Sequence, residues 1–391
     1  MKKALIFYLY GNRNAGDMAI CTGAIELLKS KGYSISMVSR FSESEEEYYR
    51  SKQYINEYYP DVKVHPGPFS FERNFSWLEK LKAYAKSFLK SIGLIRDQEI
   101  IKLINEADVV FFNGGNLLRG SCIADYLRLI ALFYPIKMAY KVGKTIYCLP
   151  QSTAKISKIG KVLLGRYLKL FKKVYVREEI SFNKLTELFP KIEFILSTDM
   201  AFFCKDNNYV LTKMDEVNID LKEENNVALI FRNSGIGDIG DLDNKIAEKL
   251  NSLVKTYVKS HEDNNYVIII QTEKDRNVSE RIYNDLKNYV NIQIIELHDP
   301  MLLREVYKKM KFTISMRLHA AILSLSALTP VYGIFSELWG LKNPGIMESY
   351  SMPYIVIENS KIKNIESIDD HNCKDKVRAY IEAYRKKIEF I

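Results

Sequence analysis

The sequence predicts an α/β fold made of two Rossmann-like domains that face a shared cleft. Short runs of β-forming apolar residues alternate with helix-forming segments, and a polar or glycine-containing motif follows most of the strands. The alternation stops at the polar stretch 205–226 and then begins again. A chain of 391 residues is also too long for one typical core, so two domains are expected.

The first half opens with a strand, a glycine-containing loop and a helix, as a Rossmann unit does. The loop lacks G-x-G-x-x-G, so it predicts no dinucleotide. Residues 64–94 are less regular and predict a loop followed by a helix at the rim of the cleft. We expect strands at 4–10, 34–39, 108–112, 144–149, 173–176 and 194–196, and helices at 18–31, 43–59, 97–107, 126–142 and 181–188, with a basic helix before residue 173.

The second half repeats the pattern and ends in a helix rich in lysine and arginine. We expect strands at 227–231, 266–271, 292–297, 312–314 and 330–334, and helices at 242–260, 277–289, 301–310, 320–328 and 369–388. The predicted organisation is an N-terminal domain (1–204), a linker (205–226), a C-terminal domain (227–358) and a helical tail (359–391).

The composition favours a soluble protein of a reducing compartment. Apolar residues make up 47% of the chain and charged residues 27%, which is typical of globular proteins. The five cysteines are scattered and form no C-x-x-C, so neither a zinc ribbon nor a disulfide framework is predicted. The longest apolar region, 127–142, is broken by charges and falls short of the roughly 20 residues of a membrane span. No signal peptide is evident, and we expect a cytoplasmic protein.

The segment 154–177 carries eight basic residues and no acidic one. On a helical wheel its lysines gather opposite Ile156, Ile159, Leu163, Tyr167 and Leu170. One interpretation is a solvated helix face packed on a sheet. The others are peripheral contact with the inner face of an anionic membrane or with a diphosphate-bearing substrate. Nucleic acid is not expected as a partner, because no aromatic-interleaved basic motif or helix-turn-helix signature is present.

Residues 314–322 predict the end of a strand, a tight turn and the start of a helix. Such a junction leaves backbone N–H groups unpaired and favours an anion. Arg317 adds a fixed cation there, and His319 adds a group that titrates near neutral pH. With Ser315, the stretch predicts an anion site with a proton donor. The alternative is an ordinary surface arginine and a histidine satisfied in the core.

Other polar motifs follow predicted strands, where open α/β sheets bind ligands. Asp17 is either a helix N-cap or a polar group directed into the cleft, and the glycine pair after residue 112 either approaches a ligand or makes a tight turn. Two further arginines end strands. The strand-end candidates are Asn14, Gly16, Asp17, Gly114, Gly115, Asn116, Gln151, Ser152, Arg177, Asp199 and Arg232.

Taken in order, these motifs resemble the polysaccharide pyruvyl transferase family. The resemblance rests on Asn14-x-Gly16-Asp17, Gly114-Gly115, Pro150-Gln151-Ser152, Arg177 with Ser181, Asp199 with Ala201 and Phe202, and Ser315-x-Arg317-x-His319-Ala320. It spans roughly residues 5–335, and the last motif is the most specific. The chain departs from the family pattern at Asn116, Thr153, Glu178 and Met200, which bears on loop details and acceptor choice.

The resemblance implies a GT-B-like pair of domains that moves pyruvate from phosphoenolpyruvate onto two sugar hydroxyls, giving a cyclic ketal and phosphate. It implies that His319 acts as general acid or base. Arg317, Arg177, Ser315 and, as a third choice, Arg232 then bind the donor, and Asp17 acts on the acceptor hydroxyl. No metal or cofactor is expected beyond this donor substrate, and the acceptor is a saccharide of a surface polymer, expected to be lipid-linked.

Two other functions fit the same sequence. A GT-B glycosyltransferase that uses a nucleotide sugar would share the architecture. A glycan-binding protein that lost turnover would share the fold, although retention of both Arg317 and His319 argues against it.

Overall fold

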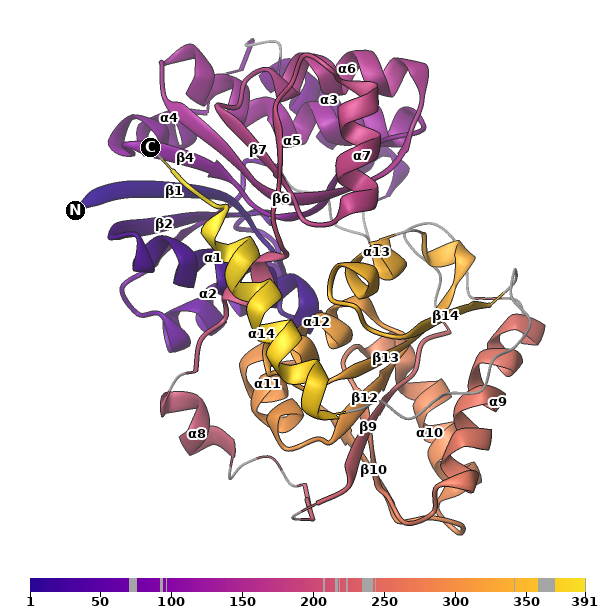
Figure 1. Ribbon diagram of the computed structural model, residues 1–391. Coiled ribbons are helices and arrows are strands. Elements are labelled where there is room, and N and C mark those ends of the chain that lie inside the picture. Colours follow the sequence, from indigo (N-terminus) through magenta and orange to yellow (C-terminus); the bar gives the residue numbers. More distant parts are fainter. Residues whose placement is uncertain are drawn as a thin grey trace. The chain divides into compact units, whose positions relative to one another are not determined.

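The computed structural model divides into two compact units, each described here by itself. Unit 1 comprises residues 1–12, 20–203 and 387–391, and unit 2 comprises residues 13–19 and 204–386. The division confirms the predicted class of two Rossmann-like domains (Figure 1). The structure describes residues 1–69, 76–91, 94–95, 97–206, 208–214, 217, 219–222, 224–233, 242, 244–340, 342–357 and 370–390.

Unit 1 is built on a parallel sheet of eight strands in the order β3-β2-β1-β4-β6-β7-β8, with β5 paired to β6. The order reverses between β1 and β4, which is the switch point of a doubly wound sheet. The strands are β1 (Lys2–Leu9), β2 (Tyr33–Ser39), β3 (Lys63–His65), β4 (Val109–Phe112), β5 (Gly115–Gly120), β6 (Thr145–Ile156), β7 (Lys173–Val176) and β8 (Phe194–Leu196).

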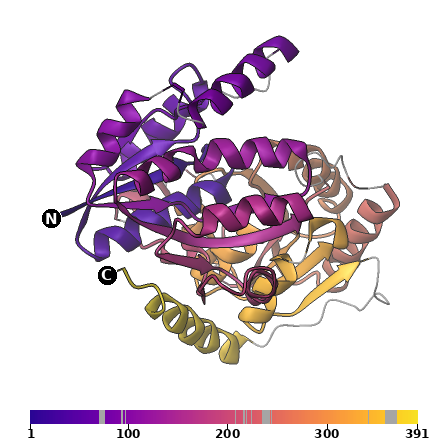
Figure 2. The ribbon, with the colours of Figure 1, turned by 90° about the horizontal axis from the view of Figure 1, so that it is seen from above.

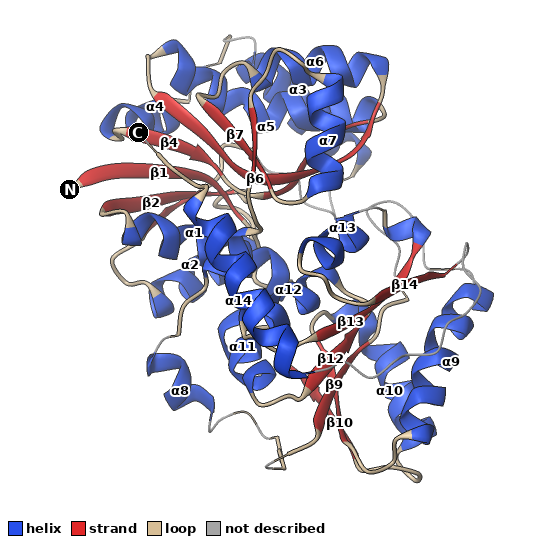
Figure 3. Cartoon of the chain, in the orientation of Figure 1, coloured by secondary structure: helices blue, strands red, loops and turns tan. Residues whose placement is uncertain are grey.

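Helices cover both faces of this sheet, which explains why β1 and β4 are continuous apolar runs (Figure 3). They are α1 (Ala15–Ser30), whose first turn belongs to unit 2, α2 (Glu46–Tyr58), α3 (Trp77–Ser91), α4 (Gln98–Glu106), α5 (Ile123–Lys141), α6 (Lys158–Leu168), α7 (Glu179–Leu188) and the 3-10 helix η1 (Met200–Phe203). The end of the chain also belongs to unit 1, because the Phe390 ring packs on Phe111 and Tyr147.

Unit 2 contains a parallel sheet of six strands in the order β11-β10-β9-β12-β13-β14. Read from its first strand, this is the strand order of a dinucleotide-binding Rossmann domain, with the switch point between β9 and β12. The strands are β9 (Asn226–Ile230), β10 (Asn265–Ile270), β11 (Ile292–Glu296), β12 (Phe312–Ser315), β13 (Val331–Ser336) and β14 (Tyr354–Ile357).

The helices of unit 2 are α8 (Asn208–Met214), α9 (Asn244–Ser260), α10 (Arg276–Leu286), α11 (Pro300–Lys308), α12 (Leu318–Ser326), α13 (Lys342–Ser349) and α14 (Asp370–Lys386), with 3-10 helices η2 (Glu273–Asp275) and η3 (Glu337–Trp339). No helix in the described part of the chain is long and apolar enough to cross a membrane.

The unit boundaries differ from the expected ones at three places. Residues 13–19 group with unit 2, because the His319 ring packs against Gly16. The expected linker also groups with unit 2, since α8 packs on α11 and Asp206 pairs with Arg304 and, at 2.6 Å, with Lys308. The expected tail divides: residues 359–369 lie outside the described part, α14 groups with unit 2, and residues 387–390 group with unit 1.

Some elements differ from those expected. β3, β5, α8, α13 and β14 were not predicted, because each is short and carries little periodic signal. The basic segment is not one helix: it contains the end of β6, then α6 and then β7. Helix α6 begins after its N-cap residue Ser157. In this helix Ile159 is exposed, on the same face as the lysines, whereas the sequence predicted it on the face opposite to them.

Candidate active site

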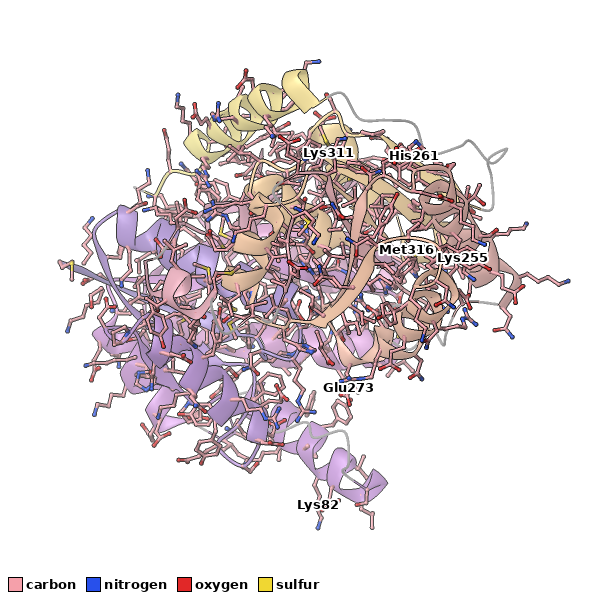
Figure 4. The ribbon with its side chains drawn as sticks, turned by 90° about the horizontal axis from the view of Figure 1, so that it is seen from below. Lys82, Lys255, His261, Glu273, Lys311 and Met316 are labelled. Carbon is pink, nitrogen blue, oxygen red and sulfur yellow. The ribbon has the colours of Figure 1, made fainter. Side chains whose placement is uncertain are left out.

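The junction between β12 and α12 is held in place by Ser315. The Arg317 N–H donates to Ser315 Oγ at 3.1 Å, and the Ser315 hydroxyl donates to the Arg317 carbonyl at 2.9 Å. Met316, labelled in Figure 4, is fully buried between them, and its N–H donates to the carbonyl of Ile230 at 3.0 Å. Arg317 is therefore the N-cap residue of α12, where the first N–H groups of the helix have no helical acceptor.

A buried carboxylate orients the guanidinium of Arg317. Its Nη2 donates to Asp275 Oδ1 at 2.8 Å, and its Nε donates to Asp275 Oδ2, which gives a two-pronged ion pair. The Asp275 side chain is 2% exposed and that of Arg317 is 16% exposed. Asp275 is the last residue of η2 and lies five residues beyond the end of β10. This carboxylate was not among the predicted residues.

A second arginine lies at the neighbouring strand end. Arg232 follows β9, and its guanidinium carbon lies 4.8 Å from the ring centroid of Trp339, a fully buried residue of η3. Burial and, to a smaller extent, the charge of Arg317 lower the pKa of Arg232 to about 9, while the Asp275 carboxylate opposes the shift. Arg232 thus stays protonated at neutral pH, but its charge costs free energy that a nearby anion would recover.

These two arginines occupy the switch point of the sheet in unit 2. β9 and β12 are hydrogen-bonded neighbours, with Ser315 opposite Ile230, and the chain continues from them to Arg317 and Arg232. Ligands of doubly wound sheets bind at this position. Arg232, Arg317 and Asp275 together carry two positive charges against one negative, so the position favours an anion.

The first glycine-containing loop of the chain joins the same unit. The Gly16 N–H donates to Asn14 Oδ1, and Asn14 Nδ2 donates to Asp17 Oδ2, both at 3.1 Å. A Cβ built on Gly16 would lie 2.1 Å from Cγ and Nδ1 of His319, so the imidazole rests directly on the glycine backbone. The Asn14-x-Gly16-Asp17 loop and His319 are therefore parts of one site, although Gly16 and His319 are 303 positions apart in the sequence.

Arg177 belongs to a separate, buried network in unit 1. Its Nη1 donates to Asp199 Oδ2 and its Nε to Ser152 Oγ, both at 2.6 Å. The side chains of Arg177 and Asp199 are each 1% exposed. The Ala201 N–H donates to Asp199 Oδ1 at 2.9 Å, which fixes the following turn. The charge of Arg177 is thus neutralised by the Asp199 carboxylate, which follows the neighbouring strand β8, and the pair is shielded from solvent.

The other unit 1 motifs are joined by hydrogen bonds that hold the ends of β4 and β6 together. Gln151 Nε2 donates to the Asn113 carbonyl at 2.5 Å, and Gln151 Oε1 accepts the Leu117 N–H at 3.1 Å. The Tyr10 hydroxyl donates to the Gly114 carbonyl at 2.7 Å. Gly115 has φ +135°, and a Cβ there would lie 2.8 Å from the Tyr10 hydroxyl, so only glycine fits.

The structure therefore brings Asn14, Gly16, Asp17, Arg232, Ser315, Arg317 and His319 into unit 2, and Gly114, Gly115, Asn116, Gln151, Ser152, Arg177 and Asp199 into unit 1. Asp275 and Trp339 were missed. The strand-end rule could have found Asp275, which follows β10 by five residues; Trp339 is one of only two tryptophans. Within the described ranges, no three His, Cys, Asp or Glu side chains gather as metal ligands.

The fold defines the class of protein. The solved structure of UDP-GlcNAc 2-epimerase from Methanocaldococcus jannaschii is similar at a TM-score of 0.55 and 14% identity, covering 99% of this chain and 93% of that one. The structure of the same enzyme from Neisseria meningitidis, bound to UDP-GlcNAc, has a TM-score of 0.53 and 14% identity, and the match covers 99% of this chain and 94% of that one. The apo UGT2 structure of Phytolacca americana has a TM-score of 0.54 and 9% identity, and the match covers 98% of this chain and 95% of that one. At these identities the likeness shows the fold alone, which is GT-B.

The family follows from the sequence profile of polysaccharide pyruvyl transferases, which matches residues 14–334. The chain therefore belongs to this family and is a transferase. No curated protein sequence matches the chain. The matched range begins at Asn14 and ends at Ile334, so it includes every candidate residue named above except Trp339.

Proposed function

We propose that this transferase moves the pyruvyl group of phosphoenolpyruvate onto two hydroxyls of a saccharide, which forms a cyclic ketal and releases phosphate. The acceptor is proposed to be a lipid-linked precursor of a surface polysaccharide. The observation that carries the proposal is the pair of arginines at the switch point of unit 2, with His319 two residues beyond Arg317.

The donor carries a carboxylate and a phosphate, so its binding requires fixed cations. Arg317 is held by Asp275 and Arg232 lies over Trp339, so both guanidinium groups are oriented before a ligand arrives. Planar guanidinium groups bind carboxylate and phosphate oxygens in pairs. The N-terminus of α12 adds N–H groups for the same anion. In this assignment Ser315 orders the turn and does not bind the donor.

The reaction moves two hydroxyl protons. Protonation of the methylene carbon makes a methyl group and leaves an oxocarbenium-like centre at C2. One sugar oxygen bonds to that carbon, the bond from C2 to the phosphate oxygen breaks, and the second hydroxyl closes the ketal. One hydroxyl proton ends on the methyl group and the other on phosphate. We assign proton transfer to His319, since imidazole exchanges protons in both directions near neutral pH. Asp17, held by Asn14, is the candidate that orients the acceptor hydroxyl.

Arg177 has a structural role in this proposal. A buried arginine paired to Asp199 and Ser152 would have to break both contacts before it could bind a donor anion. The predicted donor contact of Arg177 is therefore withdrawn in favour of Arg232.

The direct test is phosphate release from phosphoenolpyruvate with a panel of saccharide acceptors. The proposal expects release only with an acceptor, and expects it to fall by at least about a hundredfold in His319→Ala, which is the lower end of the usual range for loss of general acid–base catalysis. Acceptor-dependent release that is unchanged in His319→Ala would contradict the proton assignment. Consumption of a nucleotide sugar instead of phosphoenolpyruvate would replace the proposal with a glycosyltransferase.

A further inference from the structure

Helix α3 exposes an apolar stripe on unit 1. Leu78, Leu81 and Phe88 are 52%, 56% and 47% exposed, and they recur at helical spacing on the side of α3 away from its partner α5. The stripe continues past the helix end through Leu94 (72%) and Ile95 (37%). A contiguous group of exposed apolar side chains of this size marks an interaction surface for a protein or a membrane.

Basic side chains border the stripe. Lys82 and Lys86 are exposed along one edge of it, and Figure 4 shows Lys82 pointing outward from the helix. Glu79 is the acidic residue of the helix. A helix with leucine and phenylalanine on one face and lysine beside them has the composition of helices that lie in a membrane interface.

A second exposed patch of the same chemistry lies on α6 and the start of α5. Ile123, Ile159 and Val162 are 73%, 64% and 59% exposed. Their elements touch, because the hydroxyl of Tyr126 in α5 and that of Ser157, the N-cap residue of α6, are hydrogen-bonded at 2.5 Å. Exposed basic residues surround the patch: Lys155, Lys158, Lys161, Arg166 and Lys169.

The two patches lie on one side of the unit 1 sheet. α5 packs on both α3 and α6, and the Phe133 and Tyr167 rings of α5 and α6 stack with centroids 4.5 Å apart. Figures 1 and 2 agree that α3, α5 and α6 lie on the same side of the sheet. At its end α5 adds Tyr140 and Val142, 55% and 45% exposed, next to the exposed Lys141.

We propose that this face of unit 1, formed by α3, α5 and α6, binds the surface of a bilayer that contains anionic lipid. The apolar side chains enter the boundary between head groups and acyl chains, and the lysines contact lipid phosphates. The alternative occupant is a second copy of the chain. Lysines interleaved with the apolar residues favour lipid, because the core of a protein interface is depleted of lysine.

The apolar part is tested by co-sedimentation of the full chain with vesicles of phosphatidylcholine alone or with phosphatidylglycerol. The wild type is expected to bind the mixed vesicles, and the double variant Leu81→Glu, Phe88→Glu to lose binding. The matched control is Leu211→Glu with Tyr289→Glu on unit 2, whose side chains are 55% and 61% exposed. As a folding control, the melting temperature of each variant is measured and is expected to equal that of the wild type.

The basic part is tested by Lys158→Gln with Lys161→Gln, compared with Lys249→Gln and Lys259→Gln on α9. Loss of two charges near an anionic surface predicts about thirtyfold weaker binding for the first pair and no change for the second. The proposal is overturned if the wild type ignores the mixed vesicles, or if the glutamate variant of α3 binds them as the wild type does. A dimer that dissociates in that variant, without vesicle binding, assigns the face to a second copy instead.

Discussion

Replacement of Gly16 by alanine tests whether the glycine exists to hold His319. A methyl group there would lie 2.1 Å from Cγ and Nδ1 of the imidazole. Ordinary carbon contacts need about 3.5 Å, so the ring would have to move by about 1.4 Å. A displacement of this order at a catalytic group costs roughly a hundredfold in rate. The overpacking would lower the free energy of unfolding by about 1–3 kcal/mol, and the higher helix propensity of alanine would offset part of this loss.

The assay is acceptor-dependent phosphate release, with calorimetric binding of phosphoenolpyruvate and chemical denaturation beside it. We expect kcat to fall about a hundredfold while the donor still binds, because Arg232 and Arg317 are untouched. Gly23→Ala is the control in the same helix: its Cβ would meet the Met200 carbonyl oxygen at 1.8 Å, so stability falls and kcat of the folded enzyme does not.

The clash has a partner that can be removed. In a His319→Gly background the imidazole is absent, and so is the Cβ of residue 319, which would lie 2.2 Å from the added methyl group, so Gly16→Ala should lower neither the stability nor the residual activity further. Additive losses in this double-mutant cycle, or wild-type kcat in Gly16→Ala, would refute the packing argument.

Three further predictions address the other named groups. Arg177→Met leaves Asp199 as an unpaired buried carboxylate, so urea denaturation should show a loss of about 3–5 kcal/mol while the folded variant binds phosphoenolpyruvate as before; weakened binding instead would restore Arg177 to the donor site. Arg317→Lys replaces the two-pronged pair with Asp275 by a single point charge, so titration calorimetry should show roughly 10–100-fold weaker donor binding, and unchanged affinity would remove this arginine from the site. Burial, with Lys63 and Lys52, lowers the pKa of His65, so the unfolded chain binds the proton first and the melting temperature should fall as the pH drops through about 6.5; His65→Asn should reduce this fall, and an equal fall in both proteins would contradict the assignment.

Sequence reasoning found the strand-end residues because one rule governs them. In a parallel sheet every strand ends at the same edge, so polar residues after strands gather there, as Arg232 and Arg317 do. The rule does not say which groups neutralise one another. Arg177 and Asp199 end the neighbouring strands β7 and β8, and their charges cancel in the interior.

Contacts between distant segments were beyond the reach of local patterns. Asn14 and Asp17 were expected in the N-terminal domain, yet their loop groups with unit 2 because the His319 ring lies on Gly16. No periodicity encodes a contact of this kind. The apolar stripe of α3 shows the same limit: the sequence predicts the helix, but only its packing on α5 shows which side stays exposed.

The most direct test of the account is calorimetric titration of phosphoenolpyruvate into the wild type and into Arg232→Met. The account predicts that the wild type binds this donor and that the variant, shown to be folded by a cooperative thermal transition, loses about 2–5 kcal/mol of binding free energy, because a desolvated cation opposite the anion is removed. Equal affinity in the two proteins would contradict it. So would a wild type that binds uridine diphosphate and gives no heat with phosphoenolpyruvate.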